Sequence, residues 1–494
     1  MLKNLASMSS LNLFKAGVQF AITTLAAFYV LPQAYGLVTF SLPIIQFIAL
    51  FTDMGLASAV IRQPLLSRED AGAAMSFSVV VALIAGTLLA AAAWPIEYWS
   101  GLPNLASVLV ALAGAVVFTI VASLPRALLE RALRYQRVAA IEGVGTVIAG
   151  AICIAALMLD AGIWAIVAFH VMLQGFRASA FLWTARGDLV WNVRWARVAG
   201  LLSFGGWVLA TNIINFLARN AQNILIGVWI GAAAVGLYGM AYQFMILPLM
   251  AMAWPASGVL MATLSRLGET DRTQYRAPVL AVTTITALIA FPVMTYMTFG
   301  LAWPIAALLS PNWLALVPLL ATLAPLGALQ SLAAYNGAVL IARGHARLQF
   351  YVNVISSVLL LTGFIVSLPF GLQVFARTYL AVGAMVALGQ IAAKLWAAEV
   401  DVKSYVRALL PAIAATLAGL AAAVLVGWKP THWGEWLLVT GAYVGGVVGV
   451  FVLLRRQILK AVRNLLDGGG RVVVAADAVP DRPVPGSTVT QGVL

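Results

Sequence analysis

The chain has 494 residues, of which 63% are hydrophobic and only 9% charged, with a net charge of +13 and a mean hydropathy of +0.99. A water-soluble protein has about 25% charged residues, so this composition excludes an ordinary soluble enzyme or binding protein. Apolar runs of about 20 residues, the length of a membrane-spanning helix, recur from end to end. The sequence therefore predicts an all-α, multi-pass integral membrane protein.

Fourteen spans are predicted along the chain. The start, MLKNLASMSSLNLFKAG, has no short apolar block followed by a small-residue cleavage site, so we expect a retained first helix rather than a signal peptide. The segment after Arg463 is rich in Gly and Pro and predicts a disordered tail. The predicted spans lie near residues 11–31, 37–60, 73–94, 105–125, 139–159, 163–184, 200–229, 234–264, 279–308, 314–341, 349–369, 372–396, 406–427 and 434–454.

The distribution of Lys and Arg predicts the orientation, because positively charged loops stay in the cytoplasm. With the N-terminus inside, Lys3, six inward loops and the tail hold 24 of the 29 cationic residues. The outward loops hold only Lys429, and they carry tryptophans, as expected at the outer interface. We therefore expect both termini in the cytoplasm. The positive charge is explained by orientation and anionic lipid, and no nucleic-acid partner is expected.

Two segments about 200 residues apart are similar: AYGLVTFSLPIIQF at 34–47 and AVGLYGMAYQFMIL at 234–247. Both halves begin with the same orientation, which predicts a parallel repeat of two six-helix lobes followed by two further helices. The expected domains are residues 1–198 (spans 1 to 6), 199–398 (spans 7 to 12), 399–456 (spans 13 and 14) and the tail 457–494.

Polar residues recur at helical spacing on the first span of each half. Because polar side chains avoid lipid, each stripe is predicted to face the other half across a hydrated cavity. Asn and Gln in spans also hydrogen-bond neighbouring helices, so a purely structural role stays open for each of them. The first stripe consists of Asn12, Lys15, Gln19 and Thr23, and the second of Asn212, Asn215, Arg219 and Asn223.

Four charged residues near or inside spans have competing interpretations. Asp53 is the only acid that we place inside a span, where a proton-coupling role competes with an ion pair to Lys15. Lys15 could also extend its amine to the cytoplasmic interface. Arg177 and Arg377 lie near span ends, which favours interfacial positions.

Catalytic motifs are not visible in the sequence. The three histidines are scattered, Cys153 is the only cysteine, and no GxxxxGK[ST] phosphate-binding loop occurs. No serine or threonine lies in a recognisable nucleophile motif. We therefore expect a protein that is not an enzyme, with no catalytic residue, no metal site and no cofactor.

Three stretches carry a family resemblance: DMGLASAVIRQ from Asp53, RALLERALRYQRVAAIE from Arg126, and LSFGGWVLATNIINFLARNAQNILIGVWIGAAAVGLYGMAYQFMILPL from Leu202. With the repeat, they resemble the polysaccharide-transporter branch of the multidrug/oligosaccharidyl-lipid/polysaccharide (MOP) exporter superfamily, the Wzx-type flippases. The resemblance covers about residues 1–455.

This resemblance implies a multi-pass flippase of the bacterial cytoplasmic (inner) membrane. It would move an undecaprenyl-pyrophosphate-linked oligosaccharide from the inner to the outer leaflet for exopolysaccharide or O-antigen synthesis. The lobes would alternate access to a cationic cavity in which Lys15 and Arg219 match the family's basic positions. Implied partners are the lipid-linked cargo, membrane lipids, and a polysaccharide polymerase with its export machinery. Gln222 stands where we expect many relatives to carry an acid.

Other functions stay open. A flippase for the peptidoglycan precursor would carry the same lipid pyrophosphate, and an H⁺- or Na⁺-coupled drug antiporter would share the fold but concentrate acids in its cavity. A membrane polymerase or ligase is disfavoured because the outward loops have no arginine. A scaffold without transport would not need a polar stripe in both halves.

Overall fold

The computed structural model describes residues 17–53, 56–63, 66–188, 216, 220–265, 272–428, 430–456 and 458–459. Every element in these ranges is a helix, and they contain no strand. In the N-terminal half, the helix Gly17–Tyr29 is followed by α2 (Pro32–Asp53) and the short α3 (Leu56–Arg62). Next come α4 (Arg68–Ser100), α5 (Leu105–Arg131), α6 (Tyr135–Met158), α7 (Ile163–Ala185) and the 3-10 turn η1 (Arg186–Asp188).

The C-terminal half begins, among the described residues, with helical residues 220–229 and continues through α9 (Ala232–Pro248). The remaining elements are the π-helical η2 (Leu249–Ala253), α10 (Trp254–Leu264), η3 (Arg272–Tyr275), α11 (Arg276–Phe299), α12 (Ala302–Leu308), η4 (Pro311–Trp313), α13 (Leu316–Ala333), α14 (Asn336–Ala342), α15 (Ala346–Ser367), η5 (Leu368–Phe370), α16 (Leu372–Ala397), α17 (Val402–Val426) and α18 (Trp433–Leu453).

Eleven helical segments in the described ranges are long and apolar enough to cross a membrane, and Gly17–Tyr29 and Ala232–Pro248 are shorter apolar helices. With residues 220–229 they coincide with the predicted spans, so the structure is compatible with fourteen. The prediction of an all-α, multi-pass membrane protein is confirmed.

Several spans are interrupted rather than continuous. The ninth divides into α11 and α12, the tenth divides into α13 and α14, and the eighth passes from α9 through the π-helical η2 into α10. Pro248 precedes that π-helical segment, and Pro255 lies in the first turn of α10. Because proline has no backbone N–H group to donate within a helix, these two prolines explain the local change of helix type.

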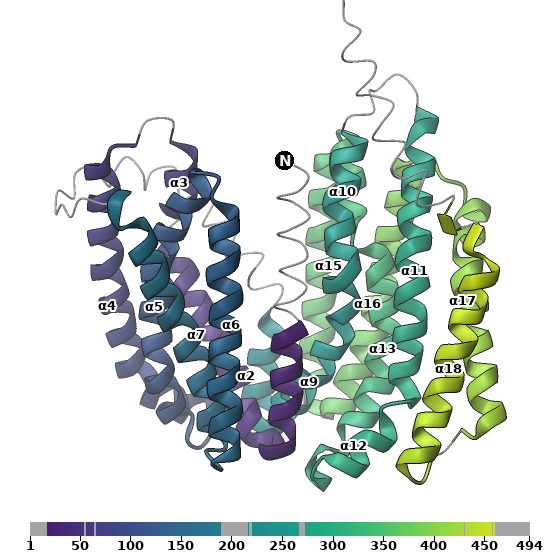
Figure 1. The fold of residues 1–494 in the computed structure, drawn as a ribbon, viewed down its shortest axis with the longest axis horizontal. Helices are drawn as coiled ribbons and strands as arrows, with labels where there is room; N and C mark the ends of the chain where they lie inside the picture. The colour runs from purple at the N-terminus through teal and green to yellow at the C-terminus, as the bar shows by residue number, and fades with distance from the viewer. Residues whose placement is uncertain are drawn as a thin grey trace, which may run out of the picture.

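The helices gather into two groups that diverge toward one end of the molecule and meet at the other (Figure 1). In the N-terminal group, α5 packs against α4 and α7, and α6 packs against α7. In the C-terminal group, α13 packs against α11 and α16, while α17 joins α18 to the outer side of α11. The predicted boundary at residue 198 and the tail beyond residue 459 lie outside the described residues, and the predicted domain limits stay predictions.

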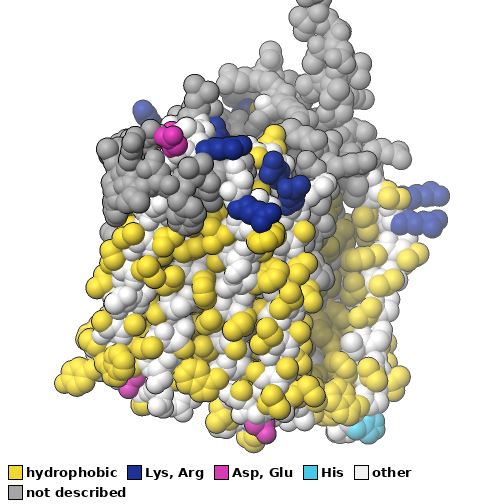
Figure 2. Space-filling view, turned by 60° about the vertical axis from the view of Figure 1, so that its left-hand side comes forward, with side chains coloured by type: hydrophobic (Ala, Val, Ile, Leu, Met, Phe, Trp, Pro, Cys, Tyr) yellow, Lys and Arg dark blue, Asp and Glu magenta, His cyan; other side chains and the backbone are white. Residues whose placement is uncertain are grey.

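The two ends of the molecule differ in their side chains. Figure 2 shows hydrophobic side chains over the middle of one face and Lys and Arg gathered at one end, which we call the basic end. The basic end includes the start of α4 at Arg68, the end of α5 at Arg131 and the start of α17 at Lys403. We call the opposite end, with Trp99, Trp428 and other tryptophans, the tryptophan end. Such a band with polar ends fits a bilayer.

The two groups meet where α2 crosses α9, and two glycines 200 positions apart make this crossing possible. A Cβ atom at Gly36 would collide with the carbonyl oxygen of Ala232, and one at Gly236 would collide with that of Pro32. Since 32 and 232 are also 200 apart, the contact is symmetric between the halves. The repeat predicted from these two segments therefore forms the junction of the molecule.

Candidate functional site

The predicted polar stripes are described only in part. Lys15, Arg219, Asn12, Asn212 and Asn215 lie outside the described residues, and so does the side chain of Asp53, the last residue of α2. Their roles stay predictions. Of the remaining stripe residues, Gln19 is exposed near the start of the first helix, and Asn223 is half-buried. The Oδ1 atom of Asn223 is buried without a hydrogen-bond partner among the described residues, an arrangement that favours a polar ligand or water beside it.

A small polar network ties the first two spans to the eighth. The Gln243 amide nitrogen donates to Thr23 Oγ1 at 2.7 Å, and the Tyr35 hydroxyl donates to Gln243 Oε1 at 3.3 Å. Thr23 itself donates to the backbone carbonyl of Gln19 at 2.9 Å. This network lies beside the α2–α9 crossing and links the two groups by side chains. The stripe residue Thr23 is thus a structural contact between the halves.

Gln222 is buried and also has a structural partner. The Tyr238 hydroxyl of α9 donates to Gln222 Oε1 at 3.0 Å. This hydrogen bond fixes residues 220–229 against α9. The Gln222 amide therefore links two neighbouring spans by a hydrogen bond, at the position where relatives are expected to carry an acid.

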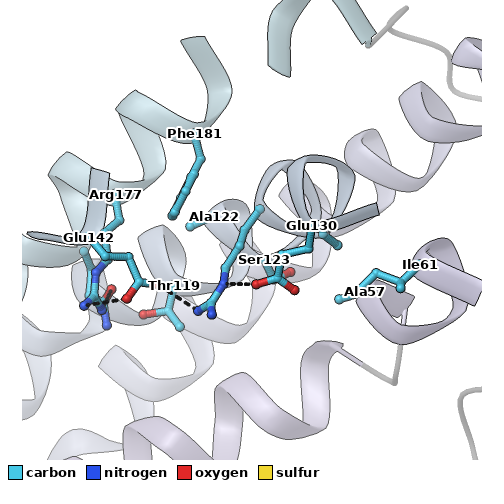
Figure 3. A pocket seen from close by; sticks show the side chains of 12 residues that line it. Ala57, Ile61, Thr119, Ala122, Ser123, Glu130, Glu142, Arg177 and Phe181 are labelled. Atoms are coloured by element: carbon cyan, nitrogen blue, oxygen red, sulfur yellow. Dashed lines mark hydrogen bonds and ion pairs between the residues drawn. The ribbon is translucent and has the colours of Figure 1, made fainter. Parts of the chain in front are cut away.

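The N-terminal group contains a polar pocket of about 360 Å³ that sequence reasoning did not find. Ala57 and Ile61 of α3 lie on one side, and Glu142 of α6 with Arg177 of α7 lie on the opposite side (Figure 3). The other residues of its wall belong to α5 and α7: Thr119, Ala122, Ser123, Arg126, Ala127, Glu130, Gln174 and Phe181. Four helices therefore contribute side chains to one pocket.

Two arginines and two glutamates form a connected network in this pocket. Arg126 Nη1 lies 3.0 Å from Glu142 Oε1, and Arg126 Nε donates to Glu130 Oε1 at 2.8 Å. Arg177 Nη2 lies 3.9 Å from Glu142 Oε2, so the buried Glu142 lies between arginines of two different helices. Glu142 is a second acid inside a span, which contradicts the expectation that Asp53 is the only one.

Arg177, which was expected at the membrane interface, lines this pocket, and its position relative to the interface stays a prediction. Its side chain is 20% exposed, contacts Glu142, and donates to Gln174 Oε1 at 3.3 Å, while its Nε atom is buried with no partner among the described residues. Arg377, its counterpart 200 positions later, is exposed, and its predicted interfacial position stays a prediction. The stretch RALLERALRYQRVAAIE places Arg126 and Glu130 one turn apart on one span and Glu142 on the next, but it does not indicate that Arg177 joins them.

An apolar groove of about 360 Å³ lies between the first, eighth, ninth and fourteenth spans. Phe20 and Phe244 pack edge to face at its inner side, with ring centroids 4.8 Å apart. The hydroxyl groups of Tyr296 and Thr440 form a hydrogen bond of 2.7 Å, and the Tyr443 hydroxyl donates to the Pro292 carbonyl at 2.8 Å. Since these polar atoms are paired with each other or with the backbone, the groove presents hydrocarbon only.

Several known proteins are similar to this chain in sequence, and one solved structure is similar to it in fold. The family model described as polysaccharide biosynthesis protein matches residues 27–318, more than half of the chain. The teichuronic acid biosynthesis protein TuaB of Bacillus subtilis (strain 168) is 32% identical over 248 residues, which cover 48% of this chain and 49% of that protein. The match thus spans about half the length of that relative.

Two further comparisons cover more of the chain. The lipopolysaccharide biosynthesis protein WzxC of Escherichia coli (strain K12) is 23% identical over 67% of this chain and 68% of its own length. The lipid II flippase MurJ, in an inward closed conformation, superposes with a TM-score of 0.72 at 13% identity, over 91% of this chain and 99% of that one. The resemblance to the polysaccharide-transporter branch of the MOP superfamily is confirmed. The chain belongs to the family of polysaccharide biosynthesis proteins.

Proposed function

We propose that this protein is a flippase that carries an undecaprenyl-pyrophosphate-linked oligosaccharide from the inner to the outer leaflet of the bacterial cytoplasmic membrane. The observation that carries the proposal is the pair of repeated helix groups, joined at the α2–α9 crossing and diverging toward the basic end. Two groups joined at one end can alternate access by rocking about that junction. The names of the sequence relatives, which act in polysaccharide or lipopolysaccharide biosynthesis, favour this class of cargo.

The basic end faces the cytoplasm in this proposal, with both termini on that side. This orientation is supported by Arg68 at the start of α4, Arg131 at the end of α5 and Lys403 in the first turn of α17. Positively charged residues near the ends of spans stay on the cytoplasmic side of the membrane. The groups diverge at this end, so the cargo enters from the leaflet in which it is synthesised.

The cargo's diphosphate requires a polar path. Lys15 and Arg219, with the amides of Asn12, Gln19, Asn212, Asn215 and Asn223, would replace the water that a diphosphate loses on entering the membrane. A cationic path suits an anionic cargo. With the cell interior negative, outward movement of an anion is favoured by about 2.3 kcal/mol per charge for every 100 mV, so transport can proceed without ATP.

The apolar groove suits the lipid part of the same cargo. It is bounded by Phe20 and Phe244 toward the junction and by Val444 and Val447 of α18 toward the outer side. A prenyl chain bound there would stay in hydrocarbon while its diphosphate occupies the polar path, which avoids the cost of exposing apolar surface to water. Its volume of about 360 Å³ accommodates a part of a long prenyl chain.

Two other functions are less favoured. A drug antiporter needs unpaired acids to hold a cation, whereas Glu142 is neutralised by Arg126 and Arg177. A peptidoglycan-precursor flippase shares the fold, as the similarity to the lipid II flippase indicates, but the sequence relatives are named for other glycans.

The first prediction concerns a strain that lacks this protein. We expect lipid-linked oligosaccharide to accumulate facing the cytoplasm and finished polysaccharide to disappear, as measured by lipid extraction and by glycan staining outside the cell. Wild type should restore the polymer and Arg219→Ala should not, because the proposed contact between the cargo's phosphate and this arginine would be lost. Arg347→Ala, which removes an exposed arginine at the basic end, is the matched control and should behave as wild type.

Two outcomes would contradict this function. If the polymer is normal in the deletion strain while sensitivity to cationic drugs rises, the protein is an antiporter. If Arg219→Ala restores the polymer fully at equal protein abundance, the flippase stands but its polar path does not include Arg219.

A further inference from the structure

The polar pocket of the N-terminal group is not used by the path proposed above. Among the described residues its walls come from α3, α5, α6 and α7, whereas the path requires the first span of each half. Charged residues inside a membrane protein are costly and mark functional sites more often than structural ones. The question is therefore what ligand this pocket suits.

Charge balance excludes ions. The lining contains the charged residues Arg126, Arg177, Glu130 and Glu142, whose formal charges sum to zero. The buried Glu142 contacts both arginines. An added anion would leave the pocket with a net negative charge, and an added cation would lie beside two guanidinium groups. Either ion would lose its hydration at a cost in free energy, and the pocket has no net opposite charge to offset that cost. A neutral ligand adds no charge and avoids both costs.

Hydrogen-bonding capacity points to a ligand with many hydroxyl groups. The buried Arg177 Nε is a donor without a partner among the described residues, and such an atom costs free energy until an acceptor reaches it. Thr119 and Ser123 donate to carbonyls of their own helix, at 2.7 and 2.9 Å, which leaves their oxygens able to accept. A hydroxyl group both donates and accepts, so it can pair with either kind of group.

The rest of the lining and the volume limit the size of the ligand. The ring of Phe181 and the side chains of Ile61 and Ala57 offer apolar surface for the C–H face of a sugar ring. The volume of about 360 Å³ lies at the lower end of small-molecule sites, which range over about 300–1,000 Å³. This is room for one or two sugar units and not for a long glycan.

We propose that this pocket binds a neutral sugar unit of the cargo's oligosaccharide while the diphosphate occupies the polar path. The inference rests on the proposed flippase function and names the part of the protein that distinguishes a glycosylated lipid from a bare one. Arg177 would donate to a sugar hydroxyl through an N–H of its guanidinium group, and Glu142 would hold the Arg177 side chain in place.

The test uses purified full-length protein and two probes, a short-chain prenyl diphosphate and the same lipid carrying a neutral disaccharide. Binding of both probes is measured by thermophoresis in detergent for wild type, for Arg177→Gln, and for a milder double variant that combines Thr119→Val with Ser123→Ala. We expect wild type to bind the glycosylated probe more tightly and Arg177→Gln to reduce that preference on the order of tenfold. Arg377→Gln, the exposed counterpart in the second half, should keep it.

The other outcomes are decisive. If Arg177→Gln weakens the binding of both probes equally, the pocket is structural or binds the diphosphate. The inference then fails while the flippase function stands. If neither pocket variant changes the preference and both elute from size exclusion as wild type does, the sugar lies elsewhere. If wild type binds neither probe, the proposed function fails, and the inference fails with it. The milder double variant keeps the test valid if Arg177→Gln does not fold.

Discussion

At the residue scale, the least expected environment is that of Lys394. The sequence places it at the start of an inward loop, but in the structure it lies in the last turn of α16 and is fully buried. Its Nζ donates to the carbonyl of Leu332 at 2.8 Å and lies 4.2 Å from the ring centroid of Tyr335. Leu332 is in the last turn of α13, where carbonyl groups lack partners and the helix dipole is negative. Lys394 therefore caps the interrupted tenth span.

This role predicts the effect of Lys394→Met, which keeps most of the volume and removes the donor. The Leu332 carbonyl would be left buried and unsatisfied, at a cost of about 1–3 kcal/mol. We expect a lower midpoint of thermal unfolding in detergent, measured by fluorescence-detected size exclusion. Lys403→Met, at an exposed lysine of α17, should leave the midpoint unchanged. Equal midpoints for wild type and Lys394→Met would contradict the capping role.

At the scale of elements, the α2–α9 crossing is the contact on which the proposed motion depends. Both Gly36 and Gly236 face backbone carbonyl groups of the partner helix, and backbone cannot move aside as a flexible side chain can. The sequence repeat located these segments correctly, because similar residues in similar order fold alike. It could not indicate that the two copies contact each other, since that depends on how the halves pack.

Gly36→Ala should therefore force the two helices apart. Overpacking of this kind costs about 1–3 kcal/mol, so we expect a lower thermal midpoint and weakened polymer restoration in the deletion strain. The matched control is Gly114→Ala in α5, where an added Cβ meets nothing within 4 Å. That control should be neutral or slightly stabilising, because alanine favours helices over glycine. If both substitutions have the same effect, the crossing is not tightly packed in the membrane.

At the scale of the whole molecule, the proposal makes a claim about orientation that single cysteines can test. Cys153 is buried and is the only cysteine, so Cys153→Ser provides a cysteine-free background. A cysteine at Thr431, exposed at the tryptophan end, should react with a membrane-impermeant maleimide in intact spheroplasts. A cysteine at Arg347, at the basic end, should react only after the membrane is opened. The reverse pattern would invert the topology and, with it, the direction of transport.

The sequence by itself determined the class of protein, the positions of the spans and the repeat. These properties are local: a span needs only about 20 apolar residues, and loop charge acts on each loop separately. Even the family could be identified from contiguous stretches such as DMGLASAVIRQ.

The tertiary structure alone decided the packing of residues distant in sequence. Arg126, Glu142 and Arg177 lie on three helices, and no periodicity within one helix indicates that they share one pocket. For the same reason, the sequence did not indicate that Arg177 lines a pocket, and Lys394 looked like part of a loop. The environment of a charge in a membrane protein depends on which helices surround it, and that is a property of the packed bundle.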